Sequence, residues 1–270
     1  MNYIGFIIFD IDGVIRDVGR SYRLAIKKTV SQFCGWEPNS SDIDKLKHEG
    51  IWNNDWDLSL ELIKRYIQAN KLKLALPSRN DIIKVFENLY FGCDPKKDYK
   101  YWNGFIKNEE LLVDKIFFDT LNINNIGWGF VSGAERISAK FVLENILKLK
   151  VPPLIAMGDA PDKPNPNGFI SLAKELTNNE LNALTPPIVY VGDTIADIKT
   201  VINARLKIPE QKFISVGVVP PHLQSKIKSK SKQSYESALI DAGADYILQS
   251  TKDIKNIFSD LFPEGQFKRF

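Results

Sequence analysis

The sequence predicts an α/β fold, a doubly wound parallel sheet with a helical segment inserted after its first strand. Two observations carry this prediction. Short apolar runs typical of strands buried on both faces, beginning with residues 3–9, alternate with helix-like segments. The alternation stops between residues 41 and about 105, where the pattern is helical throughout. Strands that alternate with helices are typical of parallel sheets with helices on both faces.

The individual elements follow from local patterns. Strands are expected at residues 3–9, 127–132, 151–157, 188–191, 213–219 and 246–248. Pro152 and Pro153 interrupt the third of these strands. Helices are expected around residues 22–33, through 41–105, and at 111–121, 137–149, 169–176, 195–204, 238–240 and 254–262.

This order of elements predicts two domains. Residues 1–16 and 106–270 form an α/β core domain, and residues 17–105 form a helical insert. A chain of 270 residues is long enough for both. The stretch 225–234, in which lysines alternate with small or polar residues, is typical of a solvated, mobile loop.

Composition restricts the class of protein. With 44% hydrophobic and 26% charged residues the chain is ordinary globular protein, and a net charge of +3 gives no reason to expect nucleic-acid binding. No apolar run approaches a membrane span, and the apolar N-terminus lacks the basic leader of a signal peptide. We therefore expect a cytoplasmic protein that is a monomer or homodimer, with Cys34 and Cys93 as two buried, unpaired thiols.

Polar clusters follow four of the predicted strands. Parallel sheets bind ligands at the carboxyl ends of their strands, so neighbouring strands would bring these clusters together. The clusters are Asp10 with Asp12; Ser132; Asp159 with Asp162 and Lys163; and Asp193 with Asp197. Carboxylates gathered in one place repel one another, and an oxygen-only ligand set favours Mg²⁺ over zinc. The lysine and the serine hydroxyl could then bind an anion that bridges to the metal.

These segments resemble the four ordered motifs of the haloacid dehalogenase superfamily. The matching stretches are residues 10–15 (DIDGVI), 132–133 (SG), 163–166 (KPNP) and 192–197 (GDTIAD). Their spacing is similar to that of subfamily I, which carries an α-helical C1 cap between the first and second motifs. The resemblance implies a Rossmann-like core, a mobile helical cap at residues 17–105, and a magnesium-dependent phosphatase acting on a small phosphorylated metabolite through a phospho-aspartate.

The resemblance also implies roles for the first motif. Asp10 matches the nucleophile that attacks phosphorus, and Asp12 matches the acid that protonates the leaving oxygen and then activates water. Dehalogenases lack an acid at the second position, because halide leaves without a proton. Asp12 therefore favours phosphoryl transfer over cleavage of a carbon–halogen bond.

Binding roles are implied for the other motifs. The metal ligands would be Asp10, the backbone carbonyl of Asp12, and Asp193, with Asp197 either a ligand or a partner of one. The phosphate would be bound by Ser132, Gly133 and Lys163. Arg16 and Asp17 replace the small hydroxyl residue common in the family after the first motif, which would leave them at the mouth of the site, where they could read the substrate.

The helical insert contains an aromatic segment with two possible roles. Trp52, Asn54 and Trp56 could contact the substrate and set specificity, or the two tryptophans could anchor the core of the insert.

Two other functions use the same motifs. A phosphomutase acting on a sugar phosphate would use the same aspartate pair but return the phosphoryl group to a second hydroxyl. A non-catalytic domain that binds Mg²⁺ and phosphate would have no use for the acid Asp12.

Overall fold

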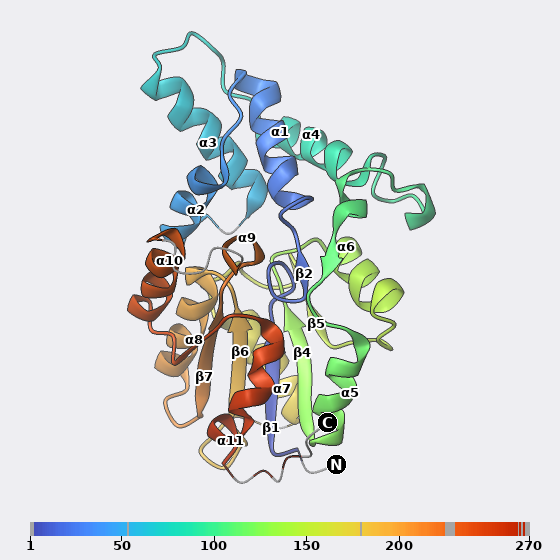
Figure 1. Cartoon of the computed structure of the whole chain (residues 1–270), viewed down its shortest axis with the longest axis vertical. Coiled ribbons are helices and arrows are strands. Elements are labelled where there is room, and N and C mark those ends of the chain that lie inside the picture. Colours follow the sequence, from blue (N-terminus) through green and yellow to red (C-terminus); the bar gives the residue numbers. More distant parts are fainter. Residues whose placement is uncertain are drawn as a thin grey trace. The chain divides into compact units, whose positions relative to one another are not determined.

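The computed structural model describes residues 3–52, 54–178, 180–224, 230–263, 265 and 267. The chain divides into two compact units, Met1–Asp17 with Leu111–Phe270, and Val18–Glu110. The first unit contains the main sheet and the second is built of helices (Figure 1). Among the described residues, no helix combines the length and the apolar character needed to cross a membrane.

The sheet of the first unit is parallel, as predicted. Within the described residues its strand order is β5-β4-β1-β6-β7-β8. The strands are β1 (Gly5–Phe9), β4 (Ile126–Val131), β5 (Leu154–Ile155), β6 (Ile188–Gly192), β7 (Phe213–Val218) and β8 (Tyr246–Leu248). Strand β1 lies between β4 and β6, which places its carboxyl end at the centre of the sheet edge (Figure 1).

Strand β5 is shorter than the predicted strand 151–157. Only Leu154 and Ile155 pair with β4, opposite Phe130 and Val131. Proline has no N–H to donate to a neighbouring strand, and Val151 has a φ of 41°, outside the extended region. The two prolines therefore precede the strand instead of belonging to it.

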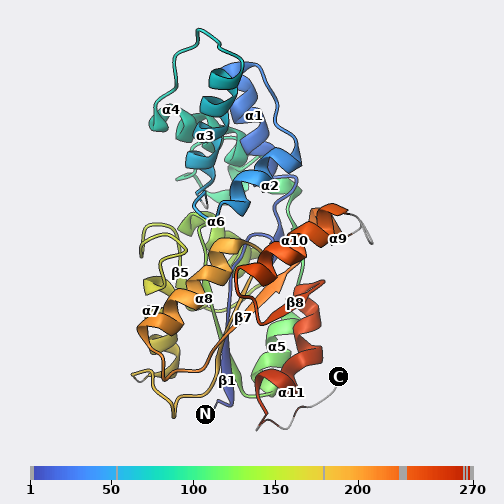
Figure 2. The same ribbon diagram turned by 90° about the vertical axis from the view of Figure 1, so that its left-hand side faces the viewer.

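Helices cover both faces of the sheet (Figure 2). Ile7 and Phe9 of β1 face α5 (Lys115–Ile123), α6 (Arg136–Lys140), its π-helical continuation Phe141–Ile146, the 3-10 helix Thr251–Ile257 and α11 (Phe258–Leu261). Phe6 and Ile8 face α7 (Asn167–Thr177) and α8 (Ile195–Lys207). This alternation along β1 is the period of two expected for a strand buried on both sides.

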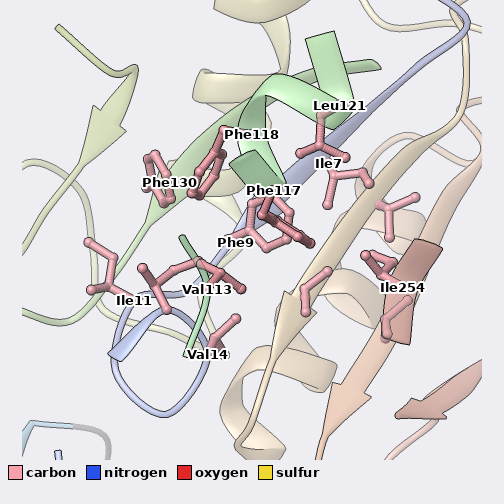
Figure 3. Packing of buried hydrophobic residues seen from close by; sticks show 14 of the residues in the cluster. Ile7, Phe9, Ile11, Val14, Val113, Phe117, Phe118, Leu121, Phe130 and Ile254 are labelled. Carbon is pink, nitrogen blue, oxygen red and sulfur yellow. The ribbon is translucent and has the colours of Figure 1, made fainter. Parts of the chain in front are cut away.

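The first face carries a cluster of aromatic rings. Phe9 contacts Phe117 and Phe118 of α5 edge-on, with ring centroids 5.7 and 6.0 Å apart, and Phe130 of β4 completes the group (Figure 3). All four side chains are fully or almost fully buried. Because each buried ring contributes about 1.5–3 kcal/mol to stability, the end of β1 immediately before Asp10 is firmly anchored.

The predicted loop at 225–234 is wrong in its second half. Helix α9 (Pro221–Gln224) precedes it, residues 225–229 lie outside the described part of the chain, and α10 (Lys230–Asp241) begins at Lys230. Tyr235 and Leu239, four residues apart, are the buried positions of α10. This helical spacing of apolar residues outweighs the polar composition of the first turn.

The second unit is helical, as the sequence pattern predicts. Its elements are α1 (Tyr22–Cys34), α2 (Ser40–His48), α3 (Asp55–Ala69), α4 (Arg79–Phe91) and the 3-10 helices Tyr99–Tyr101 and Phe105–Asn108. Two short strands, β2 (Arg16–Asp17) and β3 (Glu110–Leu111), pair where the chain passes between the units. Cys34 and Cys93 are free thiols, but both are half-buried instead of buried.

Candidate active site

Three neighbouring strands end in polar residues. Asp10 follows β1, Ser132 follows β4, and Asp193 follows β6. Because β1 pairs in parallel with both β4 and β6, these ends meet at one edge of the sheet (Figure 1). The sequence-based expectation that the motifs lie together therefore follows directly from the strand order.

Asp10 is buried, with 6% of its surface exposed. Its Oδ1 accepts a hydrogen bond from the backbone N–H of Ile11 at 2.7 Å, and its Oδ2 lies 3.1 Å from Nζ of Lys163. Lys163 is equally buried and also pairs with Asp197. A lysine and two carboxylates thus form a buried ionic cluster beneath the surface of the site.

Burial and the neighbouring charges shift the pKa values of Asp10 and Lys163. Burial, together with the negative charges of Asp197 and Asp12, raises the pKa of Asp10 from 3.8 to about 6, against the opposing effects of Lys163 and of a hydrogen bond from Ser132. Burial alone would lower the pKa of Lys163, but Asp10 and Asp197 raise it well above its usual value. The lysine therefore stays charged, whereas burial and the neighbouring carboxylates disfavour the charged form of Asp10.

Three carboxylates could hold a cation. Asp10, Asp193 and Asp197 each offer an oxygen within 4.8 Å of the others. All donors are oxygen atoms, which suits a hard cation such as Mg²⁺. Gly13, with a φ of +78°, leaves the space that Asp193 occupies: a Cβ on Gly13 would lie 2.1 Å from Oδ2 of Asp193. The turn after β1 is thus shaped around this carboxylate.

Asp197 is held in place by contacts to both of its carboxylate oxygens. It is fully buried, and its Oδ2 accepts hydrogen bonds from the N–H and the hydroxyl of Thr194, at 2.9 and 2.6 Å, in the capping box that begins α8. Its Oδ1 contacts Lys163 and the hydroxyl of Tyr190. Of the two roles left open for Asp197, this arrangement favours that of a partner which anchors Lys163.

Sequence reasoning missed Tyr190. Its buried hydroxyl accepts a hydrogen bond from Lys163 at 3.2 Å and donates one to the carbonyl of Val131 at 2.7 Å. Burial raises the pKa of Tyr190 well above its usual value, so the hydroxyl stays protonated. The signal in the sequence is a tyrosine within the buried strand 188–191, because a buried hydroxyl needs polar partners.

Asp12 lies beside Asp10 but in a different environment. Its Oδ1 forms an ion pair with Nε of Arg16 at 2.6 Å, and 24% of its side chain is exposed. Arg16 is fully buried, and its guanidinium also donates to Oγ of Ser138 at 2.8 Å. The predicted position of Arg16 at the mouth of the site is therefore wrong, since its side chain is taken up by contacts inside the protein.

The remaining predicted residues of the core differ in position. Ser132 is buried, its Oγ accepts from the N–H of Ala134 at 3.2 Å, and Gly133 follows in the same turn. Asp17 is half-buried in β2. Asp159 is bound to Arg136 and to the N–H of Ala156, and Asp162 is exposed. Neither of these two acids belongs to the group of carboxylates that could hold a cation.

The three residues predicted in the insert lie around the start of α3. Asn54 caps this helix by accepting hydrogen bonds from the N–H groups of Trp56 and Asp57. The indole N–H of Trp52 donates to Glu49 at 2.7 Å, and the guanidinium of Arg79 lies over the ring of Trp56 at 5.4 Å. Both tryptophans are half-buried, so part of each ring is accessible.

The fold and the site together indicate a class of protein. A parallel sheet that presents a buried aspartate–lysine pair and an oxygen-only cation site at the carboxyl ends of its strands is typical of α/β enzymes that bind anionic substrates. A sequence model of haloacid dehalogenase-like hydrolases matches residues 4–205, about three quarters of the chain. The chain belongs to this family.

Solved structures show the same fold. A hydrolase from Pseudomonas syringae is 18% identical, with a TM-score of 0.63, and the match covers 95% of this chain and 99% of that one. A phosphatase from Thermococcus thioreducens is 24% identical, with a TM-score of 0.56, over 87% and 99% of the two chains. A putative β-phosphoglucomutase from Thermotoga maritima is 16% identical, with a TM-score of 0.57, over 95% and 99%.

A curated relative extends the comparison. An imidazoleglycerol-phosphate dehydratase from Phytophthora nicotianae is 29% identical over 245 residues. The match covers 90% of this chain and 49% of the relative, so this chain spans about half of that protein's length.

Proposed function

We propose that the chain is a magnesium-dependent phosphatase that hydrolyses a small phosphorylated metabolite through a phospho-aspartate on Asp10. The observation that carries this proposal is the contact between Asp10 and the buried Lys163. A second aspartate, the partly exposed Asp12, follows Asp10 two residues later in the chain. A buried nucleophile next to a fixed cation, with an acid beside it, suits attack on an anionic phosphorus centre.

The proposed reaction has two steps. In the first, a carboxylate oxygen of Asp10 bonds to phosphorus, the bond to the leaving oxygen breaks, and Asp12 gives that oxygen a proton. In the second, Asp12 takes a proton from water, the water oxygen bonds to phosphorus, and Asp10 leaves as a carboxylate with release of inorganic phosphate. Lys163 and Ser132 stabilise the charge that spreads over the phosphoryl oxygens.

Asp10, the backbone carbonyl of Asp12, and Asp193 would hold the metal, with Asp197 acting through Lys163 and the α8 cap. A bound Mg²⁺ would add positive charge next to Asp10 and would offset the repulsion between an anionic substrate and this carboxylate. Burial and the neighbouring carboxylates raise the pKa of Asp10, and a bound cation would offset these effects, which supports this assignment.

We further propose that the helical unit is a cap that selects the substrate. It contains none of the four motif segments, and Trp52 and Trp56 offer partly accessible aromatic surface near the start of α3. The substrate screen we suggest covers sugar phosphates, phosphoglycolate, nucleotides and phosphorylated amino-acid precursors. Because the curated relative is named for imidazoleglycerol phosphate, that ester is added to the screen.

Release of inorganic phosphate from para-nitrophenyl phosphate tests the proposal. The wild type should turn over with Mg²⁺ and stop when EDTA is added, and Asp10→Asn should lower the rate by several orders of magnitude. Rapid turnover by Asp10→Asn would contradict the proposal. A phosphomutase would instead convert a sugar phosphate into its isomer without net phosphate release, and a binding domain would bind phosphate and Mg²⁺ without turnover.

A further inference from the structure

We propose that Arg16 is a positioning residue which orients Asp12 for its part in the reaction. The inference rests on the proposed phosphatase function, because it concerns how the acid of that site is held. Its basis is geometric: a fully buried guanidinium contacts the carboxylate of Asp12 on one side and the hydroxyl of Ser138, in α6, on the other.

The two ends of this contact differ in exposure. Arg16 has no exposed side-chain surface, whereas 24% of the Asp12 side chain is exposed. The guanidinium therefore approaches Asp12 from the protein interior and leaves part of the Asp12 side chain accessible. A planar guanidinium restricts the carboxylate's rotation more than a flexible ammonium would, because its N–H groups have fixed directions.

The backbone around Arg16 reinforces this position. The N–H groups of Ile15 and Arg16 both donate to the carbonyl of Ile11, at 2.8 and 3.1 Å, and the N–H of Gly13 donates to the carbonyl of Arg16 at 2.9 Å. The carbonyl of Val14 accepts from the hydroxyl of Thr251 at 2.6 Å. The segment from Ile11 to Arg16 is thus a closed turn, and Arg16 joins it to α6.

The contact matters most in the second step of the reaction. When the leaving group is a weakly basic phenolate, the first step proceeds without a proton from Asp12, but activation of water still requires Asp12 as a base. A loosely held Asp12 should therefore slow hydrolysis of the phospho-enzyme more than its formation. A merely structural role of Arg16 would lower the folded fraction without changing the ratio of the two steps.

The variants separate these roles. Arg16→Lys keeps a positive charge but loses the planar guanidinium that contacts Asp12 and Ser138, and Ser138→Ala removes the hydroxyl that accepts from this guanidinium. Arg23→Lys is the matched control, because Arg23 is also buried and pairs with an aspartate, Asp44 at 2.6 Å, but lies in the helical unit. Asp10→Asn, in the same assay, tests the underlying function.

The experiment follows nitrophenolate release from para-nitrophenyl phosphate in the first turnovers, with saturating Mg²⁺ and with the folded fraction measured by circular dichroism. We expect Arg16→Lys to release about one equivalent per site quickly and then turn over at least ~10-fold more slowly than the wild type. Ser138→Ala should show a smaller change of the same kind, and Arg23→Lys none.

Three results would overturn the inference. They are a steady-state rate of Arg16→Lys within about twofold of the wild type, an equal fall of both steps, and the same burst in Arg23→Lys. Substantial turnover by Asp10→Asn would instead refute the phosphatase mechanism and the role of Arg16 with it. If Asp10→Asn is inactive and Arg16→Lys shows no burst, the mechanism stands and only the positioning role falls.

Discussion

At the scale of single residues, the site depends on charges buried close together. Asp10, Lys163 and Asp197 would each be costly to bury alone, and their mutual contacts make the arrangement tolerable. These contacts do not fully offset the cost of burying the charge of Asp10, whose pKa is raised to about 6. Holding these three charges together in the interior therefore comes at some expense to the stability of the protein without a bound cation.

The raised pKa of Asp10 predicts a pH-dependent effect of Asp10→Asn on stability. A pKa raised from 3.8 to about 6 means that the folded state binds the proton more tightly than the unfolded state, so stability falls as pH rises through this window. The loss corresponds to about 3 kcal/mol. The neutral variant avoids it. In EDTA, the stability of the variant relative to the wild type should increase between pH 4 and 6. The difference should then stay constant at higher pH.

Urea unfolding at a series of pH values measures this difference, and Asp159→Asn, outside the cation cluster, is the control. A stability advantage of Asp10→Asn that shrinks as pH rises would contradict a raised pKa of Asp10 in the folded protein. Added Mg²⁺ should reduce the advantage of Asp10→Asn, because the ion stabilises the wild-type carboxylate.

Tyr190→Phe removes the hydroxyl that links Lys163 to the end of β4. We expect a loss of about 1–2 kcal/mol in stability, together with weaker inhibition by inorganic phosphate, because Lys163 loses a contact that fixes its position. Tyr90→Phe is the matched control, since its hydroxyl donates to Glu109 at 2.7 Å in the helical unit. If inorganic phosphate inhibited Tyr190→Phe as strongly as the wild type, Tyr190 would not be needed to hold Lys163 in position.

Much of this site could be predicted from the sequence. Asp10, Ser132 and Asp193 follow apolar runs of strand length, so local patterns locate them at strand ends. The contacts of Arg16 could not be predicted, because Ser138 is 122 residues away in the chain and nothing in the local pattern indicates that this arginine is buried. Asp159 satisfied the same strand-end rule but is bound to Arg136, which lies 23 residues earlier in the chain, and the rule does not consider such a pairing.

At the scale of elements, the start of α8 connects fold and chemistry. The Thr194–Asp197 capping box begins the helix, and the same aspartate reaches Lys163 with its other oxygen. Gly192 permits this approach, since a Cβ there would lie 2.2 Å from Cβ of Asp197. A common helix-start motif thus also places the acid that anchors Lys163, the residue for which we propose phosphate binding.

Thr194→Ala should therefore affect both stability and activity. Loss of the cap costs about 1 kcal/mol, and turnover should fall several-fold because Asp197 loses a hydrogen bond that orients it. Thr194→Ser should restore both. Ser78→Ala removes the corresponding cap of α4 in the helical unit and should lower stability alone. Equal turnover in Thr194→Ala and Ser78→Ala would show that the Thr194 cap does not contribute to turnover.

At the scale of the whole molecule, the chain divides into two units, for which we propose different roles. The parallel sheet and the helical insert were predictable because the periodicities of buried strands and amphipathic helices differ. The substrate was not, because the insert's surface consists of partly exposed side chains whose pattern encodes no ligand. Trp52 and Trp56 remain our candidates, now with known contacts to Glu49 and Arg79.

Substitution of Trp52 by Phe should change the ratio of specificity constants between an ester with a large leaving group and a minimal ester. The phenyl ring keeps apolar surface but loses the N–H that Glu49 accepts. We expect a change of ~3-fold or more in the ratio. Trp36→Phe is the control, since Trp36 stacks on Tyr66 in the same unit with ring centroids 4.7 Å apart. An unchanged ratio would place the substrate-reading surface elsewhere.

The central claim is that Asp10 carries the phosphoryl group during turnover. Acid quenching of the enzyme during turnover of para-nitrophenyl phosphate with Mg²⁺, followed by peptide mass spectrometry, tests it most directly. The account predicts one added phosphoryl group on the peptide that contains Asp10, removed by hydroxylamine and absent from Asp10→Asn. Full phosphate release by the wild type without this adduct, and comparable release by Asp10→Asn, would contradict it.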